Sequence, residues 1–127
     1  MNVVDSSGWL EYFADGPNAD DFAGPITDKA NLIVPVITLY EVFKRSIQQR
    51  GEEAARVCVA AMQEGRVVDI HADLALSAAK LSFDLKLPMA DSLILATARV
   101  HGATLWTQDD DFAGMPGVRY IPKPKGR

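Results

Sequence analysis

The sequence predicts a single α/β domain in which a small, mostly parallel sheet is flanked by helices. Short apolar segments such as "NVV" and "ATLWT" alternate with longer segments whose apolar residues recur at helical spacing. Strands separated by helices pair in parallel, because each helix returns the chain to the same edge of the sheet. The length of 127 residues suits one core, so we expect one domain over residues 1–127.

The first half of the chain is expected to contain two strands and two helices. A strand over residues 2–4 precedes a helix around 7–14, and the Gly- and Pro-rich stretch "ADGPNADDFAGP" at 14–25 is expected to be a connection. The stretch "ANLIVPV" at 30–36 is typical of a second strand. Residues 37–51 then form a helix, because apolar residues recur every three or four positions up to a terminal glycine.

The second half continues the alternation of strands and helices. The expected elements, in order, are a helix at 52–64, a strand "RVVDI" at 66–70, a helix at 72–87, a helix at 89–102, a strand "ATLWT" at 103–107 and an edge strand within the tail "GVRYIPKPKGR". Pro88 separates the two adjacent helices of this half.

The composition indicates the class of protein and its expected location in the cell. Hydrophobic residues make up 48% and charged residues 24% of the chain, which is ordinary for a globular protein. The opening "MNVVDSSGWLEY" lacks the basic start of a signal peptide, and no apolar run approaches the roughly 20 residues of a membrane span. The single Cys58 cannot form an internal disulfide, and His71 and His101 make no zinc pattern. We therefore expect a cytoplasmic protein with no membrane partner.

Acidic residues follow two of the expected strands directly. Asp5 comes after "NVV", and residues 109–111 come after "ATLWTQ". Glu41 and Asp91 lie early in helices that leave the same rim of the sheet. Ligands of open parallel sheets bind beyond the carboxyl ends of the strands, so these acids can converge on one site. Carboxylates and water are the ligands that Mg²⁺ and Mn²⁺ prefer.

Each acid also has a local structural explanation. Asp5 can cap the following helix, and Glu41 stands three residues after Thr38, the spacing of a capping box. Asp91 lies where a helix dipole favours an anion, and the run at 109–111 can be a solvated turn. These four explanations place no condition on one another, whereas a shared metal accounts for all the acids together.

The net charge of −4 argues against a nucleic-acid partner, because phosphates are bound by Lys and Arg. A metal held by four carboxylates would neutralise them locally and leave the rest of the chain with no net charge. Such a metal lowers the pKa of a bound water and offsets the charge that builds on a phosphoryl group. The pattern therefore favours hydrolysis of phosphodiesters.

The ordered set "VVDSS", "TLYEV", "ADSLILATA" and "TQDDDF" resembles the PIN-domain ribonucleases, specifically the VapC-type toxins of bacterial toxin–antitoxin pairs. The resemblance runs from the first strand to the last. It implies a three-layer PIN-like domain and an endoribonuclease toxin of a type II module that inhibits translation or growth. It also implies that Mg²⁺, or Mn²⁺, is held for RNA cleavage by Asp5, Glu41, Asp91 and Asp109.

The resemblance assigns further roles around these acids. Asp111 corresponds to an accessory acid that contacts the metal less directly, and Asp110 is expected to face solvent, while Phe112 anchors the turn in the core. Ser6 and Thr107 correspond to small hydroxyl residues that donate to the metal-bound carboxylates and orient them. Local capping and turn bonding are an equally good explanation of these two hydroxyls.

The resemblance also implies partners. These are an RNA substrate, a cognate VapB-type antitoxin bound by helices in the N-terminal half, a second copy of the chain in a homodimer, and operator DNA reached only through the antitoxin. Candidate phosphate contacts are Lys44, Arg45, Arg50, Lys80, Lys86, Arg99, Lys123, Lys125 and Arg127. The aromatic residues Trp9, Tyr12, Phe13, Tyr40 and Phe43 recur at helical spacing, which points to core or a partner interface before base stacking.

Other classes of protein also place aspartates at strand ends. A dehalogenase-like phosphatase requires a second acid after the first strand, where this chain has Ser7. A phosphotransfer receiver requires a lysine where "TQDDD" stands. A PIN-like scaffold that binds RNA or protein without cutting it fits the same acids and stays open as the alternative.

Overall fold

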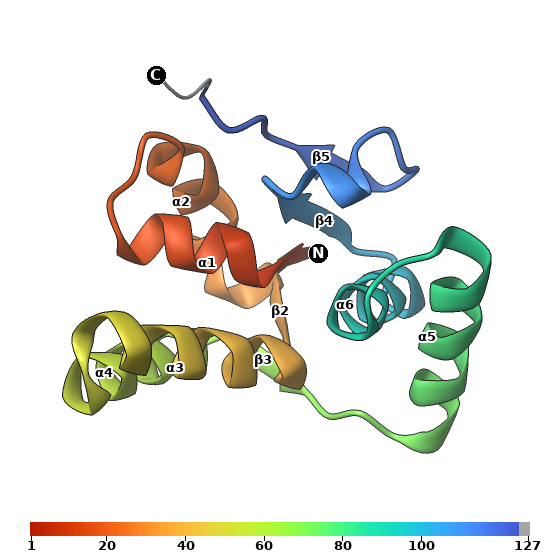
Figure 1. Ribbon diagram of the computed structural model, residues 1–127, viewed down its shortest axis with the longest axis horizontal. Coiled ribbons are helices and arrows are strands. Elements are labelled where there is room, and N and C mark those ends of the chain that lie inside the picture. The colour runs from red at the N-terminus through yellow and green to blue at the C-terminus, as the bar shows by residue number, and fades with distance from the viewer. Residues whose placement is uncertain (125–127) are drawn as a thin grey trace.

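The computed structural model describes residues 1–124, and this part of the chain forms a five-stranded sheet with helices on both faces (Figure 1). The strands are β1 (Asn2–Val4), β2 (Leu32–Pro35), β3 (Arg66–Val68), β4 (Thr104–Thr107) and β5 (Val118–Tyr120), in the order β3-β2-β1-β4-β5. Every neighbouring pair is parallel. The α/β fold with a small parallel sheet is confirmed.

The order of the strands defines one switch point. The chain starts in the centre at β1, adds β2 and β3 on one side, and then crosses to β4 and β5 on the other. The strand order therefore reverses between β1 and β4. In open parallel sheets, this is where a crevice forms beyond the carboxyl ends of the strands.

Six α-helices cover the sheet within residues 1–124. They are α1 (Ser6–Phe13), α2 (Ala19–Thr27), α3 (Val36–Arg50), α4 (Glu52–Met62), α5 (Ala72–Leu85) and α6 (Met89–Val100), with short 3-10 turns η1 (Lys29–Asn31) and η2 (Asp110–Phe112). Figure 1 shows α1 to α4 on one side of the sheet and α6 on the other, with α5 outside α6. This is the expected three-layer arrangement.

Alternation along the strands divides the core into two layers. Val3 of β1 points into the cluster that contains Ile94 and Leu95 of α6, whereas Val4 points into the cluster that contains Trp9 of α1 and Val42 of α3. Successive strand side chains face opposite sides of a sheet, so this pair fixes which face each helix covers.

The expected connection at 14–25 is wrong, because α2 begins at Ala19 and contains Pro25. Phe22 and Ile26, four residues apart, are buried on one face of this helix in the cluster that covers β1 and β2. Burial of that apolar stripe outweighs the weak helix propensity of the Gly- and Pro-rich composition.

The close packing of α1 on α2 requires a glycine. A Cβ at Gly8 would lie 2.7 Å from side-chain atoms of both Val4 and Phe22. Gly8 therefore lets the first turn of α1 approach the sheet and α2, and this turn follows directly from Asp5.

None of the helices within residues 1–124 has the length and hydropathy needed to cross a membrane.

Candidate metal centre

The five predicted acids lie at the switch point of the sheet. Asp5 follows β1, and its backbone N–H donates to the Trp106 carbonyl of β4 at 3.1 Å. Asp109 and Asp111 follow β4, Glu41 lies in the second turn of α3, and Asp91 lies in the first turn of α6. Two strand ends and two helix starts thus deliver carboxylates to one edge.

Asp5 is both a helix cap and a member of the cluster. Its Oδ1 accepts from the Gly8 backbone N–H at 2.9 Å and from Ser7 Oγ at 2.7 Å, while its Oδ2 accepts from Thr107 Oγ1 at 2.6 Å. The residue is 2% exposed, and this burial raises its pKa to about 6 although all three hydrogen bonds act to lower it. The charge of Asp109 adds to the increase. Capping and participation in the site therefore do not exclude one another.

Asp91 experiences the charge of every other acid in the cluster. Partial burial raises its pKa to about 7, and the carboxylates of Asp109, Asp5, Asp111 and Glu41 contribute to this increase, in that order of strength. One oxygen from each of Asp91, Asp109 and Asp111 lies within 4.8 Å of the other two. Asp5 and Glu41 stand outside this tightest group but close enough to act on Asp91.

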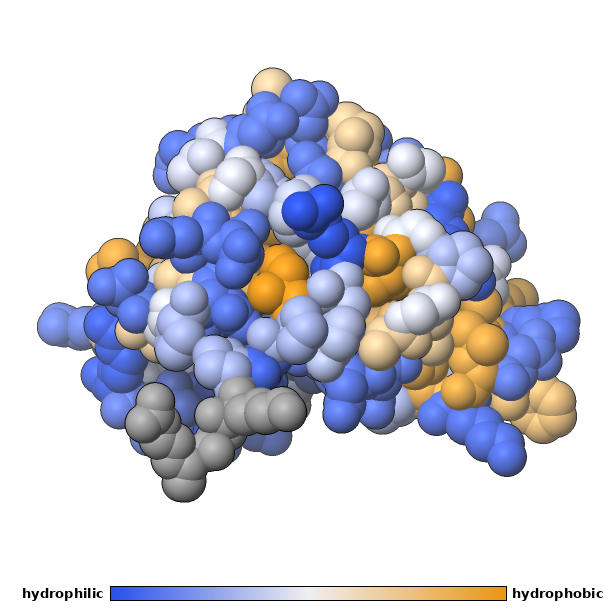
Figure 2. Space-filling model, turned by 90° about the horizontal axis from the view of Figure 1, so that it is seen from above, coloured by the Kyte–Doolittle hydropathy of each residue, from blue (hydrophilic) through white to orange (hydrophobic). Residues whose placement is uncertain are grey.

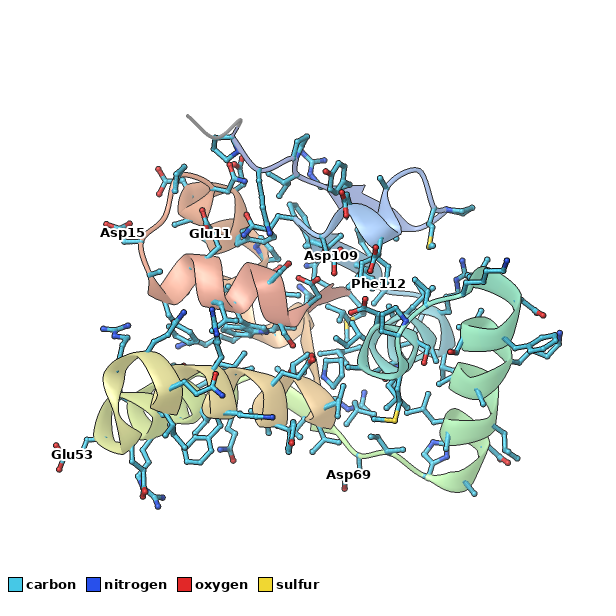
Figure 3. The ribbon with its side chains drawn as sticks, in the orientation of Figure 1. Glu11, Asp15, Glu53, Asp69, Asp109 and Phe112 are labelled. Atoms are coloured by element: carbon cyan, nitrogen blue, oxygen red, sulfur yellow. The ribbon has the colours of Figure 1, made fainter. Side chains whose placement is uncertain are left out.

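The segment after β4 holds its aspartates in different settings. Asp109 Oδ1 accepts from the Asp111 backbone N–H at 3.0 Å, and the Asp109 N–H donates to Thr107 Oγ1 at 2.9 Å. Asp110 is exposed and Phe112 is fully buried, as expected from the sequence. In Figure 3, Asp109 lies toward α1 and Phe112 toward α6.

Glu41 does not take part in a capping box. Helix α3 begins at Val36 after the N-cap Pro35, so Thr38 already lies in its first turn and donates from Oγ1 to the Pro35 carbonyl at 2.7 Å. Glu41 Oε1 instead accepts from Ser6 Oγ at 2.6 Å, across 35 residues of sequence. The capping-box alternative is therefore wrong, and the structure brings Glu41 to the start of α1.

The sequence matches the model of the PIN-domain family over residues 3–118, a range that includes every acid of the cluster. The chain belongs to the PIN-domain family. This PIN domain is 38% identical over 96 residues to a protein of Mycobacterium tuberculosis named ribonuclease VapC4, across 69% of this chain and 74% of that protein.

Solved structures share the PIN fold seen here. A toxin–antitoxin complex from Klebsiella pneumoniae matches with a TM-score of 0.78 and 26% identity over 95% of this chain and 100% of that chain. VapC20 of Mycobacterium tuberculosis, a toxin that cleaves the sarcin–ricin loop, matches with a TM-score of 0.76 and 19% identity over 91% of this chain and 95% of that chain. The resemblance carried by the four motifs is thereby confirmed at the level of the family.

The chemistry of the donor set fits a hard cation. All five side chains are carboxylates, and within residues 1–124 none of them forms an ion pair with Lys, Arg or His. Burial is the main cause of the raised pKa values of Asp5 and Asp91, and repulsion between like charges held together without a counter-charge adds to it. A divalent cation with oxygen preference, such as Mg²⁺ or Mn²⁺, removes that repulsion.

Gln108 and Ser7 lie beside the acids and were not predicted to belong to the site. The Gln108 backbone N–H donates to Ser7 Oγ at 3.3 Å, and Ser7 in turn donates to Asp5. The Gln108 amide accepts from Asn18 Nδ2 at 3.1 Å and donates to Glu11 Oε1 at 3.4 Å. The sequence signal that could have indicated Gln108 is its position as a polar residue between the end of a buried strand and an acidic run. Gln108 joins the end of β4 to α1 and to the turn before α2.

The structure places some of the candidate phosphate contacts next to the acids and others away from them. Lys44 and Arg45 lie beside Glu41, and Lys123 lies beside Asp109, in hollows next to the acids. Lys80 pairs with Asp84 on α5. Lys125 and Arg127 fall outside the described residues. Among the aromatic residues, Trp9 is buried and stacks on Phe13 at 5.6 Å, whereas Tyr40 is 63% exposed.

Proposed function

We propose that this PIN domain is a Mg²⁺- or Mn²⁺-dependent endoribonuclease that hydrolyses RNA phosphodiester bonds. The observation that supports it most strongly is Asp91, whose carboxyl is close enough to four other acids for each of them to raise its pKa. A carboxylate cluster at the switch point of a parallel sheet is suited to holding a divalent cation. The similarity to ribonuclease VapC4 supports RNA as the substrate.

The residues proposed to hold the metal are Asp5, Glu41, Asp91 and Asp109, with Asp111 as an additional ligand. A bound divalent cation supplies a water of lowered pKa and offsets charge on the phosphoryl oxygens. The protein's own contribution is to fix the carboxylates. Ser6 and Thr107 donate to Glu41 and Asp5 respectively, and each such bond orients a ligand oxygen.

We propose that the enzyme is the toxin of a type II toxin–antitoxin module and slows translation or growth in the cytoplasm. Its proposed partner is a VapB-type antitoxin, and the similarity to a solved toxin–antitoxin complex supports an antitoxin as partner. Operator DNA is then reached only through that antitoxin, because the toxin chain carries a net charge of −4 and attracts phosphates poorly by itself.

A homodimer is also proposed, through the outer face of α5 and α6. Leu76, Phe83, Met89 and Val100 are 71%, 85%, 71% and 62% exposed on this face. Figure 2 shows hydrophobic residues gathered on the side of the molecule where α5 lies. Cavities of about 570 and 540 Å³ flank α5 between these side chains. Protruding apolar groups beside hollows on one face suit a self-complementary contact between two copies.

The test of the nuclease is cleavage of total cellular RNA with Mg²⁺ or Mn²⁺, compared with the same protein in a chelator. The Asp91→Asn protein is expected to lose at least about a hundredfold of the activity while staying folded, because the substitution removes a ligand and relieves repulsion. Asp69→Asn changes an exposed aspartate that follows β3 and lies away from the acids (Figure 3), so it is the matched control and retains activity. Metal-saturated wild-type protein that binds RNA without cutting it would instead support the scaffold.

A further inference from the structure

Two hollows border the carboxylate cluster, one on each side of the first turn of α1. The first, of about 310 Å³, has Ser6, Tyr40, Glu41, Lys44 and Arg45 in its walls. The second, of about 280 Å³, is lined by Gln108, Asp109, Asp110, Tyr120 and Lys123. Each hollow therefore combines one proposed metal ligand with a tyrosine and a lysine.

The connection between the hollows runs through two neighbouring serines. Ser6 lines the first hollow and donates to Glu41, whereas Ser7 accepts from the Gln108 backbone of the second hollow and donates to Asp5. Asp5 stands directly before them at the carboxyl end of β1. A linear polymer whose reacting phosphate lies at the acids is thus positioned to meet one hollow on each side.

The first hollow presents an aromatic ring that the core does not use. Tyr40 is 63% exposed, and Lys44 Nζ lies 5.9 Å from the centroid of its ring. Within residues 1–124, neither Lys44 nor Arg45 forms an ion pair. An accessible ring beside cations that are not paired with an acid is the combination with which proteins bind an unpaired base and its phosphate.

The second hollow has a fixed wall and a free cation. The buried Gln108 amide is held by Asn18 and Glu11, and Tyr120 ends the edge strand β5. Lys123 is exposed, and it forms no ion pair with any acid in the described part of the chain although Asp109 and Asp110 line the same hollow. Its charge is available to a phosphate.

We propose that these hollows hold the two nucleotides that flank the scissile phosphate, with Tyr40 and Tyr120 stacking on the bases and Lys44 and Lys123 contacting the adjoining phosphates. The inference rests on the proposed nuclease function, since it assumes that RNA crosses the acids. It assigns the substrate contacts to four residues outside the proposed metal ligands.

The binding test uses Asp91→Asn protein with Mg²⁺ and a short fluorescein-labelled RNA of random sequence, so that the probe stays intact. Adding Tyr40→Leu or Tyr120→Leu is expected to weaken binding roughly tenfold each by fluorescence anisotropy, whereas Phe at either position retains it within about twofold. Lys44→Gln and Lys123→Gln are each expected to reduce the slope of log affinity against log salt by about 0.7.

Matched controls change the same residue types elsewhere. Phe83→Leu alters an exposed aromatic residue of α5, and Lys29→Gln alters an exposed lysine of η1. Neither residue lines a hollow beside the acids, so both variants are expected to bind RNA like the parent.

Photo-crosslinking of 5-iodouridine RNA to the Asp91→Asn protein tests stacking without changing either tyrosine, and adducts are expected on Tyr40 and Tyr120. Leu variants that are folded and bind RNA like the parent, or adducts that map elsewhere, overturn the proposal. So do Leu variants that lose only antitoxin binding, because the hollows then belong to a protein partner. A wild-type protein that binds RNA but cleaves none refutes the nuclease function, and the binding measurements then still test the two hollows.

Discussion

Thr107 Oγ1 donates a 2.6 Å hydrogen bond to Asp5 Oδ2 across 102 residues of sequence, and it accepts the backbone N–H of Asp109 at 2.9 Å. One hydroxyl group therefore joins two proposed metal ligands from the ends of β1 and β4. It donates to the first and fixes the main chain of the second.

Removal of this hydroxyl should weaken the metal site without unfolding the protein. Thr107→Val keeps the shape of the side chain but leaves Asp5 Oδ2 free to turn, so we expect the affinity for Mn²⁺ to fall by about 10- to 100-fold in calorimetric titration. Thr107→Ser keeps the hydroxyl and should stay within a few-fold of wild type. Equal Mn²⁺ affinity for the Val and Ser proteins would show that Thr107 does not position a ligand.

Metal affinity should depend on pH through Asp5 and Asp91. Their pKa values are raised to about 6 and about 7, so near pH 6 the metal-free site holds protons that a cation has to displace. Apparent Mn²⁺ affinity is expected to rise with pH from about 5.5 to about 7.5 and then level off, with proton release near pH 6 seen as a dependence of the binding heat on the buffer. Affinity that is constant over this range would contradict a carboxylate site with these pKa values.

Asp91 should reduce the stability of the metal-free protein at neutral pH. Its pKa is raised from 3.8 to about 7 on folding, so the folded state binds the proton more tightly and loses stability as the pH rises between these values. Above pH 7, Asp91→Asn should raise the free energy of unfolding by roughly 1 to 2 kcal/mol, since one pKa unit corresponds to about 1.4 kcal/mol and solvent screens the half-exposed group.

The gain from Asp91→Asn should disappear below pH 3.8, where the carboxyl is protonated in both the folded and the unfolded state. Urea unfolding in a chelator, at about pH 7.5 and at the lowest pH at which the fold persists, measures the difference. Asp110→Asn changes an exposed carboxyl of the neighbouring turn and should have little effect at either pH. If the Asp91→Asn protein were less stable than wild type at the higher pH, the crowding of charge around this carboxyl would be contradicted.

Two glycines allow a test of how closely α1 packs on α2. A Cβ at Gly8 would meet Val4 and Phe22 at 2.7 Å, whereas a Cβ at Gly24 meets nothing within 4 Å. Gly8→Ala should destabilise the fold by about 1 to 3 kcal/mol through overpacking. Gly24→Ala, within α2, should stabilise it by about 0.5 to 1 kcal/mol through helix propensity. Urea unfolding that ranks the two variants in the opposite order would show that α1 has room to move.

The parts of the molecule that were predicted correctly are those in which local pattern and burial agree. The strands were recognised because apolar residues such as Val3 and Val4 are buried on both faces of a parallel sheet. The acids were found because they follow strands or open helices, and the parallel topology brings those ends together. Phe112 was placed in the core for the same reason, as an apolar residue directly after a polar run.

The errors arose where a local motif competed with tertiary structure. The T-x-x-E spacing left a capping box at Thr38 as an alternative explanation for Glu41, but Pro35 ends β2 and α3 begins earlier, so Glu41 accepts from Ser6 instead. Helix α2 was missed because its Gly and Pro residues hid the buried pair Phe22 and Ile26. The two hollows could not be anticipated, because Tyr40 and Tyr120 come from elements whose relation is fixed only by the folded sheet.

A charge introduced on the proposed homodimer face should convert the dimer into a monomer. Phe83 is 85% exposed and Leu76 is 71% exposed on α5, so Phe83→Glu or Leu76→Glu places a carboxylate in the contact between two copies without disturbing either core. We expect light scattering to show a dimer for wild type and a monomer for each Glu variant. Val57→Glu, which introduces the same charge at a 72% exposed residue of α4, should remain dimeric. A dimer that persists in both α5 variants would place the contact elsewhere on the protein.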